Sequence, residues 1–438
     1  MNQTDKALWR LAIPMILSNV TIPLLGLVDT AVIGHLDSPV YLGGVAIGAM
    51  ATSFLFMLLL FLRMSTTGLT AQAFGAGDKA GMARALAQPL MLAVLAGVII
   101  VALREPLIAL TLRLVGGNAD VLAQANLFLQ IRWLSAPAAL ANFVILGWLL
   151  GVQYARAPVI LLIVGNVLNI GLDLLFVMGL GWKVPGAALA TVIAEYATLL
   201  LGLWLVWHVM RLRGLVPADF RGAWRSNLRR VLALNRDIML RSLLLQLCFS
   251  SLTILGARMG SDVVAVNAVL MNLLTFTAYA LDGFAYAVEA HSGQAYGARD
   301  DRQLRKVWRA ACRQAGLVAV SFSVAYALFG GHIIRLLTSI SSLQELAMHF
   351  LPWQVVLPLL GVWCYLLDGL FIGATRGAQM RNSMVVATLG YGLTLLTLPW
   401  LGNHGLWLAL AVFLSLRGLS LWVIWRRHNK AGTWFSAA

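Results

Sequence analysis

Five acidic residues lie inside long apolar segments of this 438-residue chain: Asp29, Asp173, Glu195, Asp282 and Asp368. Most other Asp and Glu residues fall in expected loops or at expected helix ends. An ionised carboxylate at the centre of a membrane-spanning helix costs about 2.5 to 3.5 kcal/mol on insertion scales. A carboxylate kept there therefore needs a partner or a function, and handling a proton or a cation is the chemistry it can perform.

Asp29 and Asp173 fall at the same expected depth as two other polar residues. If each helix rises about 1.5 Å per residue from its expected outer turn, Asp29, Asp173 and Thr191 lie about 8 to 12 Å below the outer surface. Asn169 is one helical turn from Asp173 and on the same helix face. We therefore expect these four residues to share one layer of the amino-terminal half.

A pair of carboxylates in this layer would suit the binding and release of a proton. Two carboxylates close together at low dielectric repel each other, so one of them should hold a proton near neutral pH. The amide of Asn169 and the hydroxyl of Thr191 can hydrogen-bond to either protonation state. The same oxygens would also suit a sodium ion, although a full coordination shell would need further backbone or water oxygens.

The other three acids each leave two interpretations open. Glu195 is one turn beyond Thr191, so it either extends the proton path inward or is a structural partner of a group on another helix. Asp282 and Asp368 fall near the cytoplasmic ends of their segments. They are expected either to form an inner gate with Arg376 or another basic loop residue, or to bind substrate.

The elements that position these residues are membrane-spanning helices. The chain is 60% hydrophobic and only 11% charged, and its mean hydropathy is +0.84, far from the balance of a soluble domain. Apolar runs of about twenty residues recur between residues 11 and 425, and we count roughly twelve of them. The amino-terminal segment lacks a small-residue cleavage site, so we expect the first helix to stay in the mature chain.

Basic residues are concentrated in alternate connections between the apolar runs. The formal net charge is +15, and the basic connections include "RLRGLVPADFRGAWRSNLRR", "ARDDRQLRKVWRAACR" and "WRRHNK". The intervening loops, such as "GWKVPG" and "GNHG", carry few charges. This alternation follows the positive-inside rule, so both termini should be cytoplasmic. It accounts for the basic charge without a nucleic-acid partner.

The chain also repeats itself. "TAQAFGAGDKAGMARAL" matches "SGQAYGARDDRQLRKVW", and the same offset places "GWLLG" on "GLFIG". The repeat predicts an amino-terminal lobe over residues 1–210, a cytoplasmic connection over 211–235, and a carboxyl-terminal lobe with a cytoplasmic tail over 236–438. Parallel repeats of this kind suit alternating access around a cavity between two pseudo-symmetric six-helix lobes. The alternative is that duplication only builds a large helical bundle.

Several motifs resemble those of the multidrug and toxic compound extrusion (MATE) exporters, in particular their bacterial DinF-like branch. The motifs are "GLVDTAVIGHL", "GNVLNIGLD", "GAALAT", "QAFGAGD" and "QAYGARD". The resemblance implies a twelve-helix, two-lobe transporter that exports mostly cationic, amphipathic compounds in exchange for protons or sodium ions. It also assigns the amino-lobe coupling site to Asp29, Asn169, Asp173 and Thr191.

The resemblance places a bend of the first helix at Pro14. Pro23 is closer to Asp29 and adds a second weak point, because each proline removes an intrahelical hydrogen bond. The chain departs from the family at Leu25, Leu146 and Leu150, where related members carry polar or charged residues, so the network around the acids is thinner. By the internal repeat, Asp29 of the first half aligns with Leu252 of the second half. The coupling site is therefore expected in the amino-terminal lobe alone.

No catalytic constellation or nucleotide cradle is present, and neither the histidines nor the three cysteines have metal-ligand spacing. We therefore expect no enzyme, cofactor or bound metal, and a monomer in the bacterial inner membrane. The leading hypothesis is a secondary multidrug antiporter in which protonation at Asp29 and Asp173 rearranges the first helix. The alternatives are a lipid-linked precursor flippase of the same superfamily and a non-transporting scaffold or channel.

Overall fold

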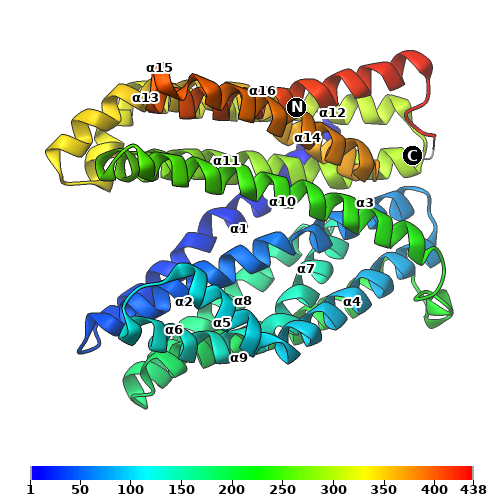
Figure 1. Cartoon of the computed structure of the whole chain (residues 1–438). Coiled ribbons are helices and arrows are strands. Elements are labelled where there is room, and N and C mark those ends of the chain that lie inside the picture. The colour runs from blue at the N-terminus through cyan, green and yellow to red at the C-terminus, as the bar shows by residue number, and fades with distance from the viewer. Residues whose placement is uncertain (1, 437–438) are drawn as a thin grey trace. The chain divides into compact units, whose positions relative to one another are not determined.

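The computed structural model describes residues 2–436, except for the side chains of residues 21–30. The described chain is almost entirely helical (Figure 1). The helices of the first half are α1 (Gln3–Gly34), α2 (Pro39–Leu58), α3 (Phe61–Gly75), α4 (Lys79–Ala102), α5 (Arg104–Val115), α6 (Ala119–Arg132), α7 (Ala136–Gly151), α8 (Arg156–Asp173) and α9 (Lys183–Leu212). Those of the second half are α10 (Leu228–Arg258), α11 (Ser261–Gly297), α12 (Asp301–Leu337), α13 (Ser341–Gly373), α14 (Gly377–Thr394), α15 (Leu398–Leu401) and α16 (Asn403–Ala431).

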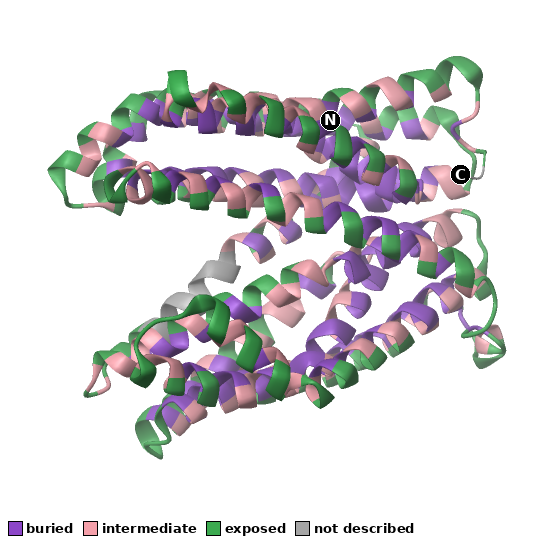
Figure 2. Ribbon diagram, in the orientation of Figure 1, coloured by how far each residue is buried: buried purple, intermediate pink, exposed green. Residues whose placement is uncertain are grey.

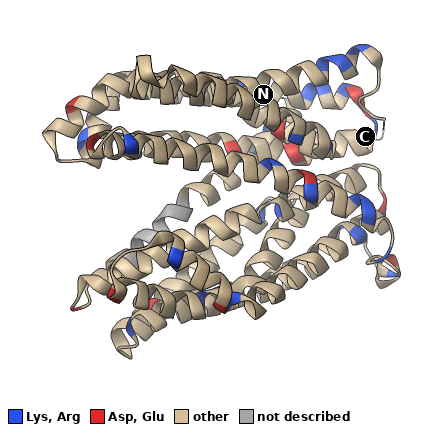
Figure 3. Cartoon of the chain, viewed as in Figure 1, with Lys and Arg blue, Asp and Glu red and all other residues tan. Residues whose placement is uncertain are grey.

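Eleven segments among the described residues are long and apolar enough to cross a membrane, some of them made of two helices, such as α2 with α3. The 32-residue α1 is long enough for the twelfth span that the sequence predicts. Large apolar side chains such as Leu336 and Trp400 are exposed, as a lipid-facing surface requires. Figure 2 shows exposed positions along the helices of both units. Basic residues gather toward helix ends, most visibly where α12 begins and α16 ends (Figure 3).

The chain packs into two compact units. The amino-terminal unit is Val20–Val231, and the carboxyl-terminal unit combines the chain from Leu232 onward with the segment that precedes Val20. The first half of α1 therefore packs with the second half of the sequence. The centre of its Trp9 ring lies 5.2 Å from that of Phe284 in an edge-on arrangement. Its Asp5 forms an ion pair with Arg313 of α12, with 2.9 Å between Oδ1 and Nη2.

Each repeated glycine pair packs one helix closely against another. In the first unit, a Cβ on Gly147 or Gly151 of α7 would lie 2.6 Å from an atom of α3. In the second, a Cβ on Gly369 or Gly373 of α13 would lie 2.5 Å from an atom of α11. Because such distances are too short for carbon, only glycine allows these approaches, and the repeat seen in the sequence is a repeat in packing.

The repeated loops before α4 and α12 also have the same backbone. Asp78 accepts a hydrogen bond from Gly81 N at 2.9 Å and caps α4, and Asp300 accepts one from Gln303 N at 3.1 Å and caps α12. The residue before each cap is left-handed, with φ of 68° at Gly77 and 55° at Arg299. Glycine adopts this conformation without strain, whereas arginine does not.

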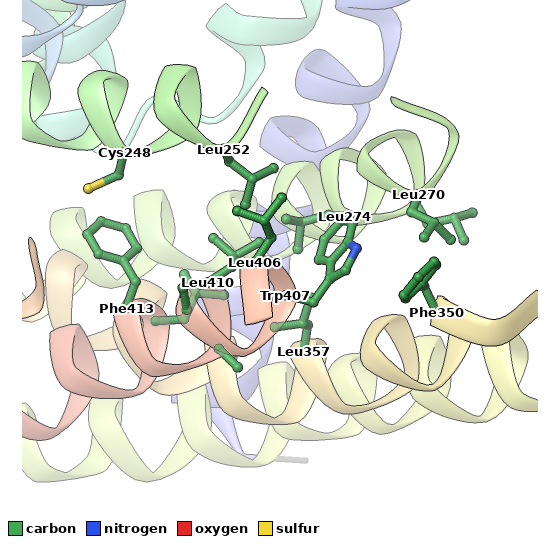
Figure 4. Packing of buried hydrophobic residues seen from close by; sticks show 14 of the residues in the cluster. Cys248, Leu252, Leu270, Leu274, Phe350, Leu357, Leu406, Trp407, Leu410 and Phe413 are labelled. Carbon is green, nitrogen blue, oxygen red and sulfur yellow. The ribbon is translucent and has the colours of Figure 1, made fainter. Parts of the chain in front are cut away.

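The core of the carboxyl-terminal unit is a continuous apolar cluster from α10, α11, α12, α13, α14 and α16, part of which is shown in Figure 4. Trp407 of α16 is fully buried at its centre. Its Nε1 donates to Asn267 Oδ1 at 3.1 Å, and the Asn267 side chain is paired with that of Asn403. Buried polar groups are thus satisfied inside the helix bundle, as a low-dielectric interior requires.

Candidate functional site

Three of the four predicted coupling residues are buried in the amino-terminal unit. Asn169 and Asp173 lie one turn apart on α8, with exposed fractions of 2% and 0%, and Thr191 of α9 is 8% exposed. The Thr191 hydroxyl donates to Asn169 Oδ1 at 3.4 Å. α8 and α9 pack side by side, so the predicted layer of polar groups is present for these three residues.

The helix changes its geometry at Asp173. Leu174–Gly179 form a π-helical turn directly after it, and Leu180 N donates to Leu175 O at 2.8 Å across five residues. The Phe176 ring stacks on the Trp182 ring at 4.9 Å and fixes the end of this turn. π turns insert one residue into a helix and are frequent at functional sites. The apolar sequence "LLFVMG" gave no signal for it.

Two predicted residues, Asp29 and Pro23, have side chains outside the described residues. Their pairing with Asp173 and their part in a bend stay predictions. Pro14 is described: it is half-buried in the part of α1 that belongs to the carboxyl-terminal unit. The helix continues through it without interruption.

Glu195 is held by a cation from another helix. Arg132 of α6 binds both of its carboxylate oxygens, at 2.8 Å and 3.2 Å. The Arg132 guanidinium also lies 5.3 Å from the centre of the Phe56 ring. Asn142 of α7 donates to the Glu195 carbonyl at 3.2 Å. The structural-partner interpretation therefore has a physical basis, and Asn142, one turn before Leu146, is a polar neighbour that sequence reasoning missed.

Asp368 is buried in an ion-pair cluster with two arginines. Its Oδ2 accepts from Arg241 of α10 and from Arg417 of α16 at 2.7 Å. All three side chains are at most 10% exposed. Pairing with basic groups was expected for Asp368, but the partners come from inside the helix bundle rather than from a loop. Asp282, which the sequence suggested together with Asp368 as a gate or substrate-binding residue, is half-buried in α11.

Arg376, the loop partner that the sequence suggested for Asp368, binds the carboxyl-terminal tail. Its Nη2 donates to the Trp434 carbonyl at 2.7 Å, and its guanidinium lies 4.7 Å from the centre of the Trp434 ring. Burial lowers the pKa of the Arg376 guanidinium, an effect that the neighbouring Tyr296 partly opposes. The tail after α16 is thus attached to the connection between α13 and α14.

Glu289 and Arg63 are buried charged residues that were not singled out from the sequence. Glu289 of α11 is 1% exposed and Arg63 of α3 is 2% exposed. Arg63 lies beside buried hydroxyls and donates to Thr67 Oγ1 at 3.4 Å. The run "RMSTTGLT" was the available signal, because so many hydroxyls in an apolar segment indicate a buried polar face. Within the described residues, no group of three His, Cys, Asp or Glu side chains could hold a metal ion.

The MatE family model matches residues 14–175 and 238–400, which together are most of the chain. The chain therefore belongs to the MatE family: it is a multi-pass membrane transporter of the MATE type and not an enzyme. It is 72% identical over 437 residues to DNA damage-inducible protein F of Escherichia coli, covering all of this chain and 95% of that protein. It is also 28% identical to the probable multidrug resistance protein NorM of Deinococcus radiodurans, over 95% of this chain and 94% of that one.

Solved structures share the fold. An outward-facing multidrug resistance MATE transporter of the MOP superfamily matches with a TM-score of 0.88 at 22% identity, over 98% of this chain and 97% of that one. A MATE protein in a bent conformation matches with a TM-score of 0.88 at 22% identity, over 100% and 98%. The predicted fold class, an all-helical two-lobe membrane transporter, is confirmed.

Proposed function

We propose that this protein is a secondary active multidrug exporter that exchanges cationic or amphipathic organic compounds for inward-moving protons. The observation that carries the proposal is Asp173, fully buried inside a membrane-spanning segment with Asn169 and Thr191 beside it. Family membership supports transport of small organic compounds. Both termini would be cytoplasmic in the bacterial inner membrane, and one chain with two repeated halves would act as a monomer.

In this mechanism, the protonation state of Asp173 sets the energy of the site. An ionised carboxylate in this buried layer is costly, so a proton from outside stabilises it, and release to the inside completes the cycle. Asn169 and Thr191 supply both donor and acceptor atoms, so they can serve either state. Asp29 would complete the pair from α1. Drug and proton exclude each other at the site, and that exclusion produces antiport.

Efflux in proteoliposomes tests the proposal. A fluorescent organic cation is loaded, and proton and sodium gradients are imposed separately on wild type, Asp173→Asn and Asp29→Asn. The control is Asp120→Asn, an exposed acid at the start of α6. We expect both site variants to lose proton-driven export while the control keeps it. Full export by Asp173→Asn at equal protein amount would refute the coupling model, and dependence on sodium alone would change the ion.

A lipid-linked precursor flippase remains the alternative. The observation that favours it is the Arg241–Asp368–Arg417 cluster, in which two guanidiniums share one carboxylate. Excess positive charge suits a pyrophosphate. Movement of a pyrophosphate-linked lipid across the bilayer, lost in Arg241→Gln and unaffected in Asp173→Asn, would decide for this alternative.

A further inference from the structure

A groove on the carboxyl-terminal unit lies between α12, α13 and α16. Its volume is about 510 Å³, and its lining is apolar and aromatic, with Trp308, Trp363 and Trp422 at its walls. Trp363 and Trp422 are 48% and 40% exposed. These helices cross the membrane, and we take the open side of the groove to face lipid. Its size falls within the range of small-ligand sites, roughly 300 to 1,000 Å³.

The groove runs along the direction of the spans. Its lining on α13 extends from Leu367 to Leu359, which is about 12 Å along a helix. Leu367 is six residues before the cytoplasmic end of α13, or about 9 Å from that end. The groove therefore starts below the expected headgroup layer and follows α13 into the hydrocarbon, the path of an acyl chain.

A basic residue lies one turn nearer the cytoplasm than the groove tryptophan on each of the two flanking helices. On α12 this is Arg305, three residues before Trp308, and on α16 it is Arg426, four residues after Trp422. Residues at these spacings share a helix face. The Arg426 guanidinium lies 5.1 Å from the centre of the Trp422 ring, and α12 meets α16 where Trp308 packs on Trp425 at 4.9 Å.

The arginines also lie at the depth of lipid phosphates. Arg305 is four residues from the start of α12 and Arg426 is five from the end of α16, so both are about 6 to 8 Å from the helix ends. The headgroup regions together make up about 10 to 15 Å of a bilayer, half on each side. Figure 3 shows the basic residues gathered at these helix ends. Arg305 also pairs with Asp301 at 3.0 Å, on an exposed surface where such a pair contributes little.

We propose that this groove is a binding site for an anionic phospholipid of the cytoplasmic leaflet, with one acyl chain against the tryptophans and the phosphate bound by Arg305 and Arg426. The charge of the arginines matches an anionic headgroup, and the apolar groove beneath them matches the chain. The site is separate from the acids of the amino-terminal unit, so it stands or falls independently of the transport mechanism.

Native mass spectrometry of the purified full chain in detergent tests the proposal. Phosphatidylglycerol and phosphatidylcholine with identical chains are titrated separately, and inorganic phosphate is added as a competitor. We expect one phosphatidylglycerol to be retained in preference to phosphatidylcholine. Each arginine near an anionic membrane surface contributes about fivefold in affinity, so Arg305→Gln/Arg426→Gln should bind about 25-fold more weakly.

Two further variants make the test specific. Lys306→Gln/Arg427→Gln removes the same charge from other faces of the same helices and should retain the lipid. Leu419→Trp fills the groove while keeping both arginines, and should lose the lipid although its melting temperature is unchanged. Equal binding of the two lipids, equal loss in both double variants, retention by Leu419→Trp, or displacement by inorganic phosphate would each overturn the proposal.

Discussion

Substitution of Asp368 should reveal what its two arginines contribute. Asp368→Asn leaves the guanidiniums of Arg241 and Arg417 buried together, with side chains only 6% and 5% exposed. Removing one partner of a buried ion pair typically costs about 3 to 5 kcal/mol, because it leaves a charge without compensation. Here two cations lose the acid that bridges them, so the upper part of that range is expected.

The asymmetry of the cluster gives a matched comparison. Arg241→Met leaves one arginine with one carboxylate, a neutral pair, so its loss of stability should be clearly smaller than that of Asp368→Asn. Asp301→Asn breaks the exposed pair with Arg305 and should cost about 0 to 1 kcal/mol. The double variant Asp368→Asn/Arg241→Met should recover part of the stability lost in Asp368→Asn.

Thermal unfolding of the purified proteins in one detergent measures these differences. From the highest midpoint to the lowest, we expect the order wild type, Asp301→Asn, Arg241→Met, Asp368→Asn. Export assayed per folded molecule then separates structure from gating. Unchanged export means that the cluster holds the helices together, and lost export at wild-type stability means that Asp368 is a gate. Equal midpoints for Asp368→Asn and Arg241→Met would refute the charge argument.

Three further outcomes follow from the structure. Glu195→Gln should lower the unfolding midpoint, because it leaves Arg132 without its bidentate partner, and Arg132→Gln/Glu195→Gln should restore part of the loss. Gly373→Val should cost about 1 to 3 kcal/mol by overpacking against α11, whereas Gly316→Ala, where a Cβ meets nothing, should cost nothing by the same measurement. Arg376→Ala should release the tail that holds Trp434, seen as faster amide exchange over residues 432–436 with the helices unchanged.

The sequence predicted features that depend on repetition and spacing. Gly147 and Gly369 occupy equivalent places in the repeat and make equivalent close contacts. Asn169 and Asp173 are four residues apart on a helix that was easily recognised, and counting residues from the outer turn brought Thr191 to their level. Length and hydropathy were sufficient for the spans because a bilayer imposes both.

The partners of charged residues could not be predicted in the same way. Arg132 and Glu195 are far apart in sequence, and only the packing of α6 on α9 brings them together. Asp368 of α13 and Arg241 of α10 are likewise far apart in the sequence, and their ion pair forms only in the folded chain. The π turn after Asp173 depends on the hydrogen-bond register of a few apolar residues, and their composition does not reveal that register.

The packing of α1 constrains where that helix can bend. Residues after Pro14 contact α11: a Cβ on Gly283 would overlap Ile16, and Asn19 Nδ2 donates to Tyr279 O at 3.2 Å. The Gly283 Cβ would also lie 3.2 Å from the carbonyl of Ala12, which precedes Pro14. A bend at Pro14 must release both contacts, whereas a bend at Pro23, beyond Asn19 in the chain, need not.

A disulfide between Ile16→Cys and Gly283→Cys, in a chain whose three cysteines are replaced, distinguishes a bend at Pro14 from a bend at Pro23. The two side chains would be close enough to bridge after a small shift. If the transport cycle bends α1 at Pro14, oxidation should abolish export and reduction should restore it. Export that persists in the oxidised protein would exclude Pro14 and place the bend after residue 16, on the same side as Pro23 and Asp29.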